Sequence, residues 1–106
     1  MVLDSERGGT GRLQVGGRET FRIARVHVQL LRNGRAHLHT EGRNELRYEG
    51  TWTPGGQGIA NVVLRGGLGG ERMQGFVRHS NGRVTLLELS GTRDSKYYSL
   101  EFDPGR

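Results

Sequence analysis

The chain contains no cysteine among its 106 residues, which excludes a disulfide framework, a thiolate nucleophile and a sulfur-ligated metal site. Apolar residues make up only 32% of it, so few positions are available for a hydrophobic core. No apolar run approaches the roughly 18 residues of a membrane span, and we expect no membrane partner. We expect no leader segment ahead of the fold, and the sequence leaves the cellular compartment open.

Lysine is nearly missing too. Lys96 stands alone beside fifteen arginines, and the formal net charge is +5. Codon bias in a GC-rich genome is one explanation of this skew. The distribution of charge along the chain is uneven, because residues 7–47 carry nine arginines against three glutamates and residues 48–106 are almost neutral. A one-sided basic half is the pattern expected of a surface that contacts a polyanion.

Glycine is abundant, with 19 residues, and several of them lie within an internal repeat. The segment RNGRAHL at residues 32–38 recurs as SNGRVTL at residues 80–86. A strand with aromatic side chains closes each unit, through Tyr48 and Trp52 in the first and Tyr98 and Phe102 in the second. Each unit has the pattern of four strands, so the sequence predicts eight strands.

Alternating apolar side chains place these strands at residues 11–16, 20–31, 35–41, 46–53, 59–65, 71–79, 83–90 and 96–103. No apolar spacing typical of a helix persists between the glycines. Eight strands with short connections favour an all-β fold, a small antiparallel eight-stranded up-and-down barrel, because closure removes exposed strand edges. A two-sheet β-sandwich is the alternative.

One domain is expected over residues 1–106, since domains usually contain 50 to 250 residues. Within it we expect a flexible lead-in at 1–9, a first four-strand unit at 10–53, a Gly-rich connection at 54–58 and a second unit at 59–106.

The triplet Gly50-Thr51-Trp52 resembles the Gly-x-Trp element that lipocalins and avidins place on their first strand. The predicted barrel is also similar to those families in its general architecture. In this chain the triplet lies on the fourth predicted strand, which departs from the pattern of both families.

The first Asn-Gly turn allows the register of its hairpin to be predicted. A three-residue loop at 32–34, with Gly34 in the left-handed region as part of a bulge, keeps the apolar side chains on one face. That face pairs Leu30 with Ala36, Val28 with Leu38 and Val26 with Thr40. The other face pairs Gln29 with His37, His27 with His39 and Arg25 with Glu41.

Two irregularities are expected in the strands. Phe21 and Ile23 have the opposite parity to Val26, which implies a bulge near residues 24–25. In the second hairpin the apolar side chains lie on both faces, so either a bulge lies near residues 86–87 or both faces are covered.

The first candidate site is the interior of the barrel. Four aromatic side chains are expected to face inward and to bind a small apolar or ring-bearing ligand: Tyr48, Trp52, Tyr98 and Phe102. Gly50 is expected to leave room beside the rings. An eight-stranded barrel is just wide enough for one small ligand, and the alternative is that the rings simply fill it.

The second candidate site is the outer face of the first hairpin, which is predicted to bind a polyanion or nucleic acid. Its cationic residues are Arg25, Arg35, His37, His39, Arg43 and Arg47. Arginine binds phosphate through two parallel hydrogen bonds and also stacks on bases. Glu41, Glu45 and Glu49 interrupt the positive field, and this face lacks exposed aromatic side chains.

The same face is a candidate for a metal ion, because His27 and His39 are predicted to lie opposite each other with Glu41 nearby. Arg25 beside them repels a cation, so a solvated polar face is the expected state and no metal or cofactor is assigned.

Catalysis is not expected. No Gly-x-Ser-x-Gly element is present, and the glycines of residues 66–70 lack the Lys-Ser/Thr ending of a phosphate-binding loop. Glu88 is the one acid expected to face inward, paired with Arg78.

These observations favour a non-catalytic binding module with a small-molecule ligand inside the barrel. A polyanion-binding face on the first hairpin is the alternative. A structural or protein-interaction domain, dimeric through Leu31 and the second hairpin, is a further alternative.

Overall fold

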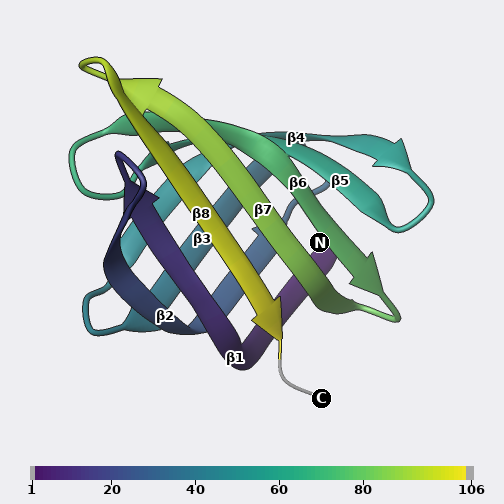
Figure 1. The fold of residues 1–106 in the computed structure, drawn as a ribbon. Coiled ribbons are helices and arrows are strands. Elements are labelled where there is room, and N and C mark those ends of the chain that lie inside the picture. Colours follow the sequence, from purple (N-terminus) through teal and green to yellow (C-terminus); the bar gives the residue numbers. More distant parts are fainter. Residues whose placement is uncertain (1, 105–106) are drawn as a thin grey trace.

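In a computed structural model, which describes residues 2–104, the chain forms eight antiparallel strands that close into an up-and-down barrel in chain order (Figure 1). The strands are β1 (Leu3–Val15), β2 (Arg18–Leu30), β3 (Arg35–Gly42), β4 (Leu46–Gly56), β5 (Ile59–Gly66), β6 (Glu71–Ser80), β7 (Arg83–Arg93) and β8 (Lys96–Pro104). The predicted eight-stranded barrel is therefore confirmed. Among residues 2–104 there is no helix long and apolar enough to cross a membrane.

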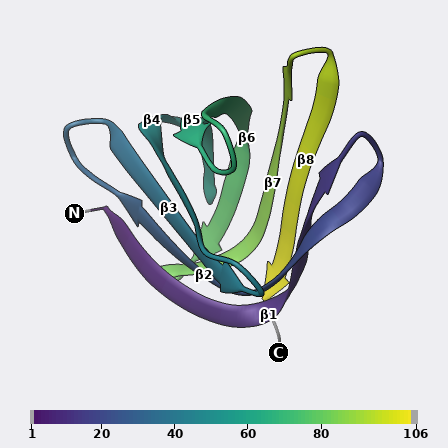
Figure 2. The ribbon, with the colours of Figure 1, turned by 90° about the vertical axis from the view of Figure 1, so that its left-hand side faces the viewer.

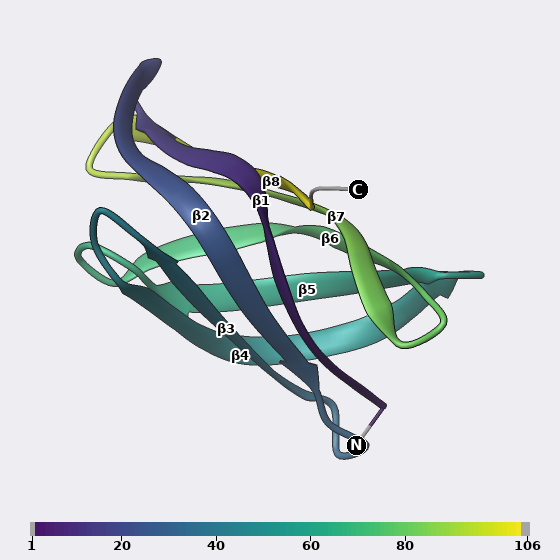
Figure 3. The same cartoon turned by 90° about the horizontal axis from the view of Figure 1, so that it is seen from below.

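The barrel closes through β1, which pairs with β2 along most of its length and with β8 along its second half. In Figure 3, β8 and the second half of β1 lie on one side of the barrel, and β3 and β4 lie on the opposite side. The predicted connection at 54–58 is shorter than expected, because β4 continues to Gly56 and only Gln57 and Gly58 form the turn.

The flexible lead-in predicted at residues 1–9 is wrong for the described part of that segment, because β1 begins at Leu3. Leu3 pairs with Leu30, and the side chains of Leu3 and Ser5 are buried. The Ser5 hydroxyl accepts a hydrogen bond from the Val84 amide at 3.0 Å, and the Arg7 guanidinium donates to the Val84 carbonyl at 3.1 Å. These bonds hold the first half of β1 against β7, along the base of the barrel (Figure 2).

The register of the first hairpin is confirmed. His27 lies opposite His39 and Val28 opposite Leu38. The loop has three residues, since Leu31 donates to the Arg35 carbonyl, and Gly34 has a φ of 87°. The expected bulge is present as well, as a register shift between Ile23 and Arg25.

The second hairpin also contains a bulge, close to the predicted place. Arg78 pairs with Leu86 and His79 pairs with Val84, so Thr85 is the extra residue on β7. As a result Leu86 faces outward. Glu88 has the same parity and is exposed, so the prediction that it faces inward is wrong.

The core consists of inward side chains from all eight strands, and residues such as Leu13, Leu30, Met73 and Leu100 have no exposed surface. Glycines in the strands allow close approach of neighbouring backbones. A Cβ atom at Gly50 would overlap the carbonyl oxygen of Val63 on β5. Gly50 is therefore required by the packing of β4 against β5, and not, as expected, to leave room beside the aromatic rings.

Candidate functional site

The four aromatic side chains of the predicted interior site are placed inward, as expected from their parity. Tyr48, Tyr98 and Phe102 are buried, and Trp52 is half-buried against the core. Along each strand the two rings are four residues apart, which separates them by about 13 Å at 3.3 Å per residue. They therefore form two levels of the core instead of one compact cluster.

The polar atoms of two of these rings already have protein partners. The Trp52 indole N–H donates to the Leu31 carbonyl at 2.8 Å, and the Tyr48 hydroxyl donates to Glu71 Oε2 at 3.2 Å. Tyrosine and tryptophan bind ligands through an apolar face and one polar atom. Because both polar atoms are used internally and both rings pack in the core, these residues serve the barrel itself.

A buried carboxylate that the sequence analysis missed lies beside Tyr48. Glu71 has no exposed surface, and it accepts hydrogen bonds from the Leu68 amide at 3.1 Å and the Gly69 amide at 3.0 Å. With the Tyr48 hydroxyl it has three donors. The signal for this residue was its parity, because Glu71 precedes the buried Met73 by two residues and so faces the same side of β6.

Glu71 and Tyr48 anchor the loop between β5 and β6 to the barrel. Gly67 of this loop has a φ of 71°, and a Cβ atom there would overlap both Glu71 Oε2 and the Tyr48 hydroxyl. Burial raises the pKa of Tyr48 well above its usual value, and the negative charge of Glu71 raises it further. The hydrogen bonds of Glu71 and Tyr48 all join parts of the barrel to one another, so these two residues have a structural role.

Most side chains of the predicted anion site lie on the outer face of β2–β5. Cross-strand pairing places His37 between Gln29 on β2 and Glu49 on β4. His39 lies between His27 and Arg47 in the same way. On the far side, Glu49 pairs with Arg65 of β5, which extends the face by one strand.

A groove of about 480 Å³ runs over this face. Its walls are formed by His27, Gln29, His37, Leu38, His39, Arg47, Tyr48, Glu49, Arg65 and Gly66. Of the six residues predicted for this site, His37, His39 and Arg47 line the groove. Arg65 was missed, because its position depends on the register across the β4–β5 turn, which the sequence analysis did not derive.

The other three predicted arginines do not converge on the groove. Arg25 lies in a neighbouring hollow of about 110 Å³, where it forms an ion pair with Glu6 at 3.4 Å. Arg35 begins β3 and Arg43 follows its end, so about 26 Å of extended strand separates them. The predicted cationic residues therefore follow the whole length of β3, and only some of them line the groove.

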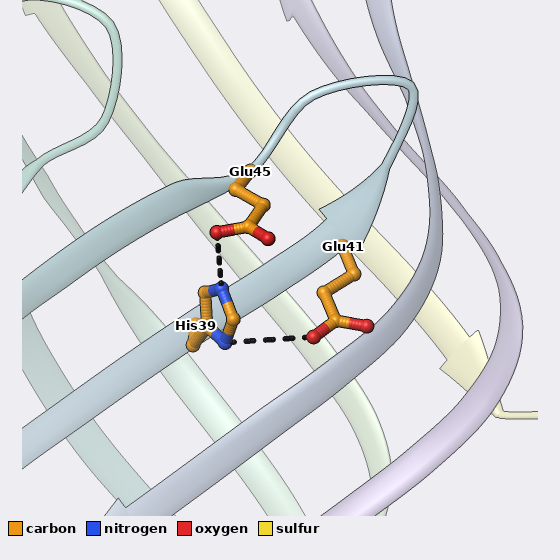
Figure 4. Close-up of side chains that lie close together, drawn as sticks. All are labelled: His39, Glu41 and Glu45. Carbon is orange, nitrogen blue, oxygen red and sulfur yellow. Dashed lines mark hydrogen bonds and ion pairs between the residues drawn. The ribbon is translucent and has the colours of Figure 1, made fainter.

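Several cationic groups of this face are already near carboxylates. Arg47 lies 3.8 Å from Glu45, and His27 contacts Asp4. His39 is placed between two acids, with Nε2 3.4 Å from Glu45 Oε2 and Nδ1 3.9 Å from Glu41 Oε1 (Figure 4). These acids come from the turn and the strand end, beyond the groove lining, and they reduce the positive charge at one end of the face.

Comparison of the chain with protein-family models, with curated proteins and with solved structures finds no match. The geometry of the barrel and its surface is therefore the basis for any statement about function.

Proposed function

We propose that the protein is a non-catalytic binding module and that the groove over β2–β5 binds a nucleic-acid strand through its phosphates. The observation that carries this proposal is the groove itself, because three histidines and two arginines line it around a single carboxylate, Glu49. The formal net charge of +5 and the excess of arginine in the first half of the chain agree with an anionic partner.

The ligand is expected to be extended. Arg47 and Arg65 lie in the middle of the face, whereas Arg35 and Arg43 flank β3 at its two ends. A compact anion reaches only the central pair. A polymer that follows the direction of β3 reaches all four guanidinium groups, each of which can bind a phosphate through two parallel hydrogen bonds.

Binding is expected to be independent of base sequence. The exposed Tyr97 and the half-buried Phe76 lie on β8 and β6, away from the groove, so they offer no stacking platform for bases there. Contacts to phosphates position a strand without reading its sequence.

A ligand inside the barrel, the first expectation from the sequence, has less support. The rings proposed to bind it pack in the core, and Tyr48 and Trp52 use their polar atoms internally. A ligand there would have to displace core side chains, which pack as densely as organic crystals.

The test is fluorescence polarisation with a labelled single-stranded oligonucleotide at 50 and 200 mM salt. If four phosphates are neutralised, the affinity falls about 50-fold between these concentrations, from a slope of roughly −0.7 per phosphate contact. The variant Arg47→Ala/Arg65→Ala leaves two contacts, so its affinity falls only about sevenfold over the same range.

The matched control is Arg22→Ala/Arg83→Ala, which removes the same charge from exposed positions outside the groove. This control should keep the steep salt dependence. Absence of binding at 50 mM salt, or an equal loss in both double variants, would show that the groove is not the binding surface.

A further inference from the structure

We propose that His39, Glu41 and Glu45 form a binding site for a divalent transition-metal ion such as Zn²⁺. This site has a different ligand class from the proposed anion groove and does not depend on it. One nitrogen of His39 and one oxygen of each glutamate lie within 4.8 Å of one another. Imidazole nitrogen and carboxylate oxygen are ordinary zinc ligands.

The spacing of these atoms is close to the spacing that a metal imposes. Two ligands of a tetrahedral Zn²⁺, each about 2.1 Å from the ion, lie about 3.4 Å from each other. His39 Nε2 and Glu45 Oε2 are 3.4 Å apart, and His39 Nδ1 and Glu41 Oε1 are 3.9 Å apart (Figure 4). Because an ion uses one nitrogen of the ring, one carboxylate must swing toward that nitrogen.

The positions of the three residues allow that movement. His39 and Glu41 project from the same face of β3, and Glu45 lies directly before β4. The His39 side chain is only 22% exposed, whereas those of Glu41 and Glu45 are 50% and 63% exposed. The imidazole is therefore largely enclosed, and the two carboxylates are exposed. Binding of an ion needs little rearrangement of the backbone, because the pairing of Thr40 with Leu46 fixes it beneath these side chains.

The local charge also permits a cation. Two guanidinium groups lie near the carboxylates: Arg47 is 3.8 Å from Glu45, and Arg25 is the cross-strand partner of Glu41. Arg25, which the sequence analysis expected to repel a metal ion, is paired with Glu6. An ion must displace the contact between Arg47 and Glu45, and exposed pairs of this kind contribute little.

Three protein ligands leave a fourth position for water, as in zinc sites that are not closed. The register of the first hairpin predicts His27 as the partner of His39, so this set is not apparent from the sequence. His27 contacts Asp4 instead, and Glu45 reaches His39 from the turn before β4.

The experiment is thermal unfolding and calorimetric titration of the chelator-treated protein with Zn²⁺ alone. At a hundredfold excess over the dissociation constant, Tm should rise by roughly 10 °C. His39→Ala and Glu41→Gln/Glu45→Gln should each lose at least tenfold in affinity. The matched controls His37→Ala, on the same face of β3, and Glu49→Gln, on β4, should bind Zn²⁺ like wild type.

Mn²⁺ gives a second measurement that does not depend on stability. The paramagnetic ion should broaden the imidazole resonances of His39 far more than those of His79, which lies on β6. Absence of any Tm shift at millimolar Zn²⁺, or an equal loss of affinity in His37→Ala and His39→Ala, would overturn the proposal.

The same variants separate this proposal from the anion groove. Glu41→Gln/Glu45→Gln removes two negative charges beside the groove, so it should weaken Zn²⁺ binding at least tenfold while oligonucleotide binding becomes tighter. Loss of Zn²⁺ binding with unchanged or tighter oligonucleotide binding supports the metal site. Wild-type Zn²⁺ binding that the double variant retains would refute it, whatever the oligonucleotide does.

Discussion

The buried carboxylate of Glu71 offers the sharpest test of how the barrel is held together. Its Oε1 accepts from the Gly69 amide, and its Oε2 accepts from the Leu68 amide and the Tyr48 hydroxyl. The substitution Glu71→Gln keeps the shape of the side chain but replaces one acceptor oxygen by an NH₂ group. At least one partly buried backbone N–H donor then faces another donor.

The magnitude follows from these contacts. An unpaired donor costs up to about 1–3 kcal/mol, depending on its burial, and the remaining bonds lose the strengthening that a charged acceptor provides. We therefore expect Glu71→Gln to lower the free energy of unfolding by about 2–4 kcal/mol. For a chain of this size that corresponds to a decrease in Tm of roughly 8–16 °C.

The assay is urea unfolding followed by circular dichroism, with Glu88→Gln as the matched control. Glu88 is exposed on β7, so its substitution should change the free energy of unfolding by less than about 0.5 kcal/mol. Tyr48→Phe removes one of the three donors without leaving an unpaired one, and should cost about 1 kcal/mol. A loss below 1 kcal/mol in Glu71→Gln would refute the argument that this carboxylate anchors the loop.

Two further predictions concern the same barrel. Gly50→Ala should destabilise the protein by about 3 kcal/mol or more in urea unfolding, because the new Cβ meets the Val63 carbonyl, whereas Gly34→Asn in the exposed turn should cost much less. The raised pKa of Tyr48 means that its contribution to stability is complete below pH 10 and declines above it, by up to about 1.4 kcal/mol per pH unit. Urea midpoints from pH 9 to 11.5 should therefore fall more steeply in wild type than in Tyr48→Phe, and equal slopes would contradict this.

The first hairpin shows which parts of the fold can be predicted from the sequence. The turn at Asn33 and Gly34 and the alternation on both sides of it leave one register that puts all apolar side chains on one face. Every pair of that register is present, including His27 with His39. Local information is sufficient here because the turn chemistry and the hydrophobic pattern agree.

The first half of β1 shows the opposite case. Between residues 3 and 9 only Leu3 is apolar, so the segment has no alternation that predicts a strand. Its position depends on Ser5 and Arg7, which bind the backbone of Val84 on β7, a strand that does not pair with β1. Contacts between residues so distant in sequence depend on the closed barrel and are not visible in the segment itself.

Part of the candidate site can also be predicted from the sequence. Parity identified the outward faces of His37, His39 and Arg47, because these residues lie on strands whose register the turn determines. Parity alone grouped Arg35 with Arg43, although their spacing of eight residues places them at opposite ends of β3. Glu71 was overlooked because an acid is rarely buried unless it is paired, and its backbone donors belong to a loop.

The two proposed sites share His39, and this has a thermodynamic consequence. An ion bound by His39, Glu41 and Glu45 neutralises the two negative charges beside the groove. Zn²⁺ should therefore tighten oligonucleotide binding, by about fivefold for a modest coupling, and the oligonucleotide must tighten Zn²⁺ binding by the same factor. Both affinities can be measured at 50 mM salt in wild type and in His39→Ala. An equal effect of Zn²⁺ in the two proteins would show that the ion acts on the oligonucleotide, and the coupling through His39 would then be wrong.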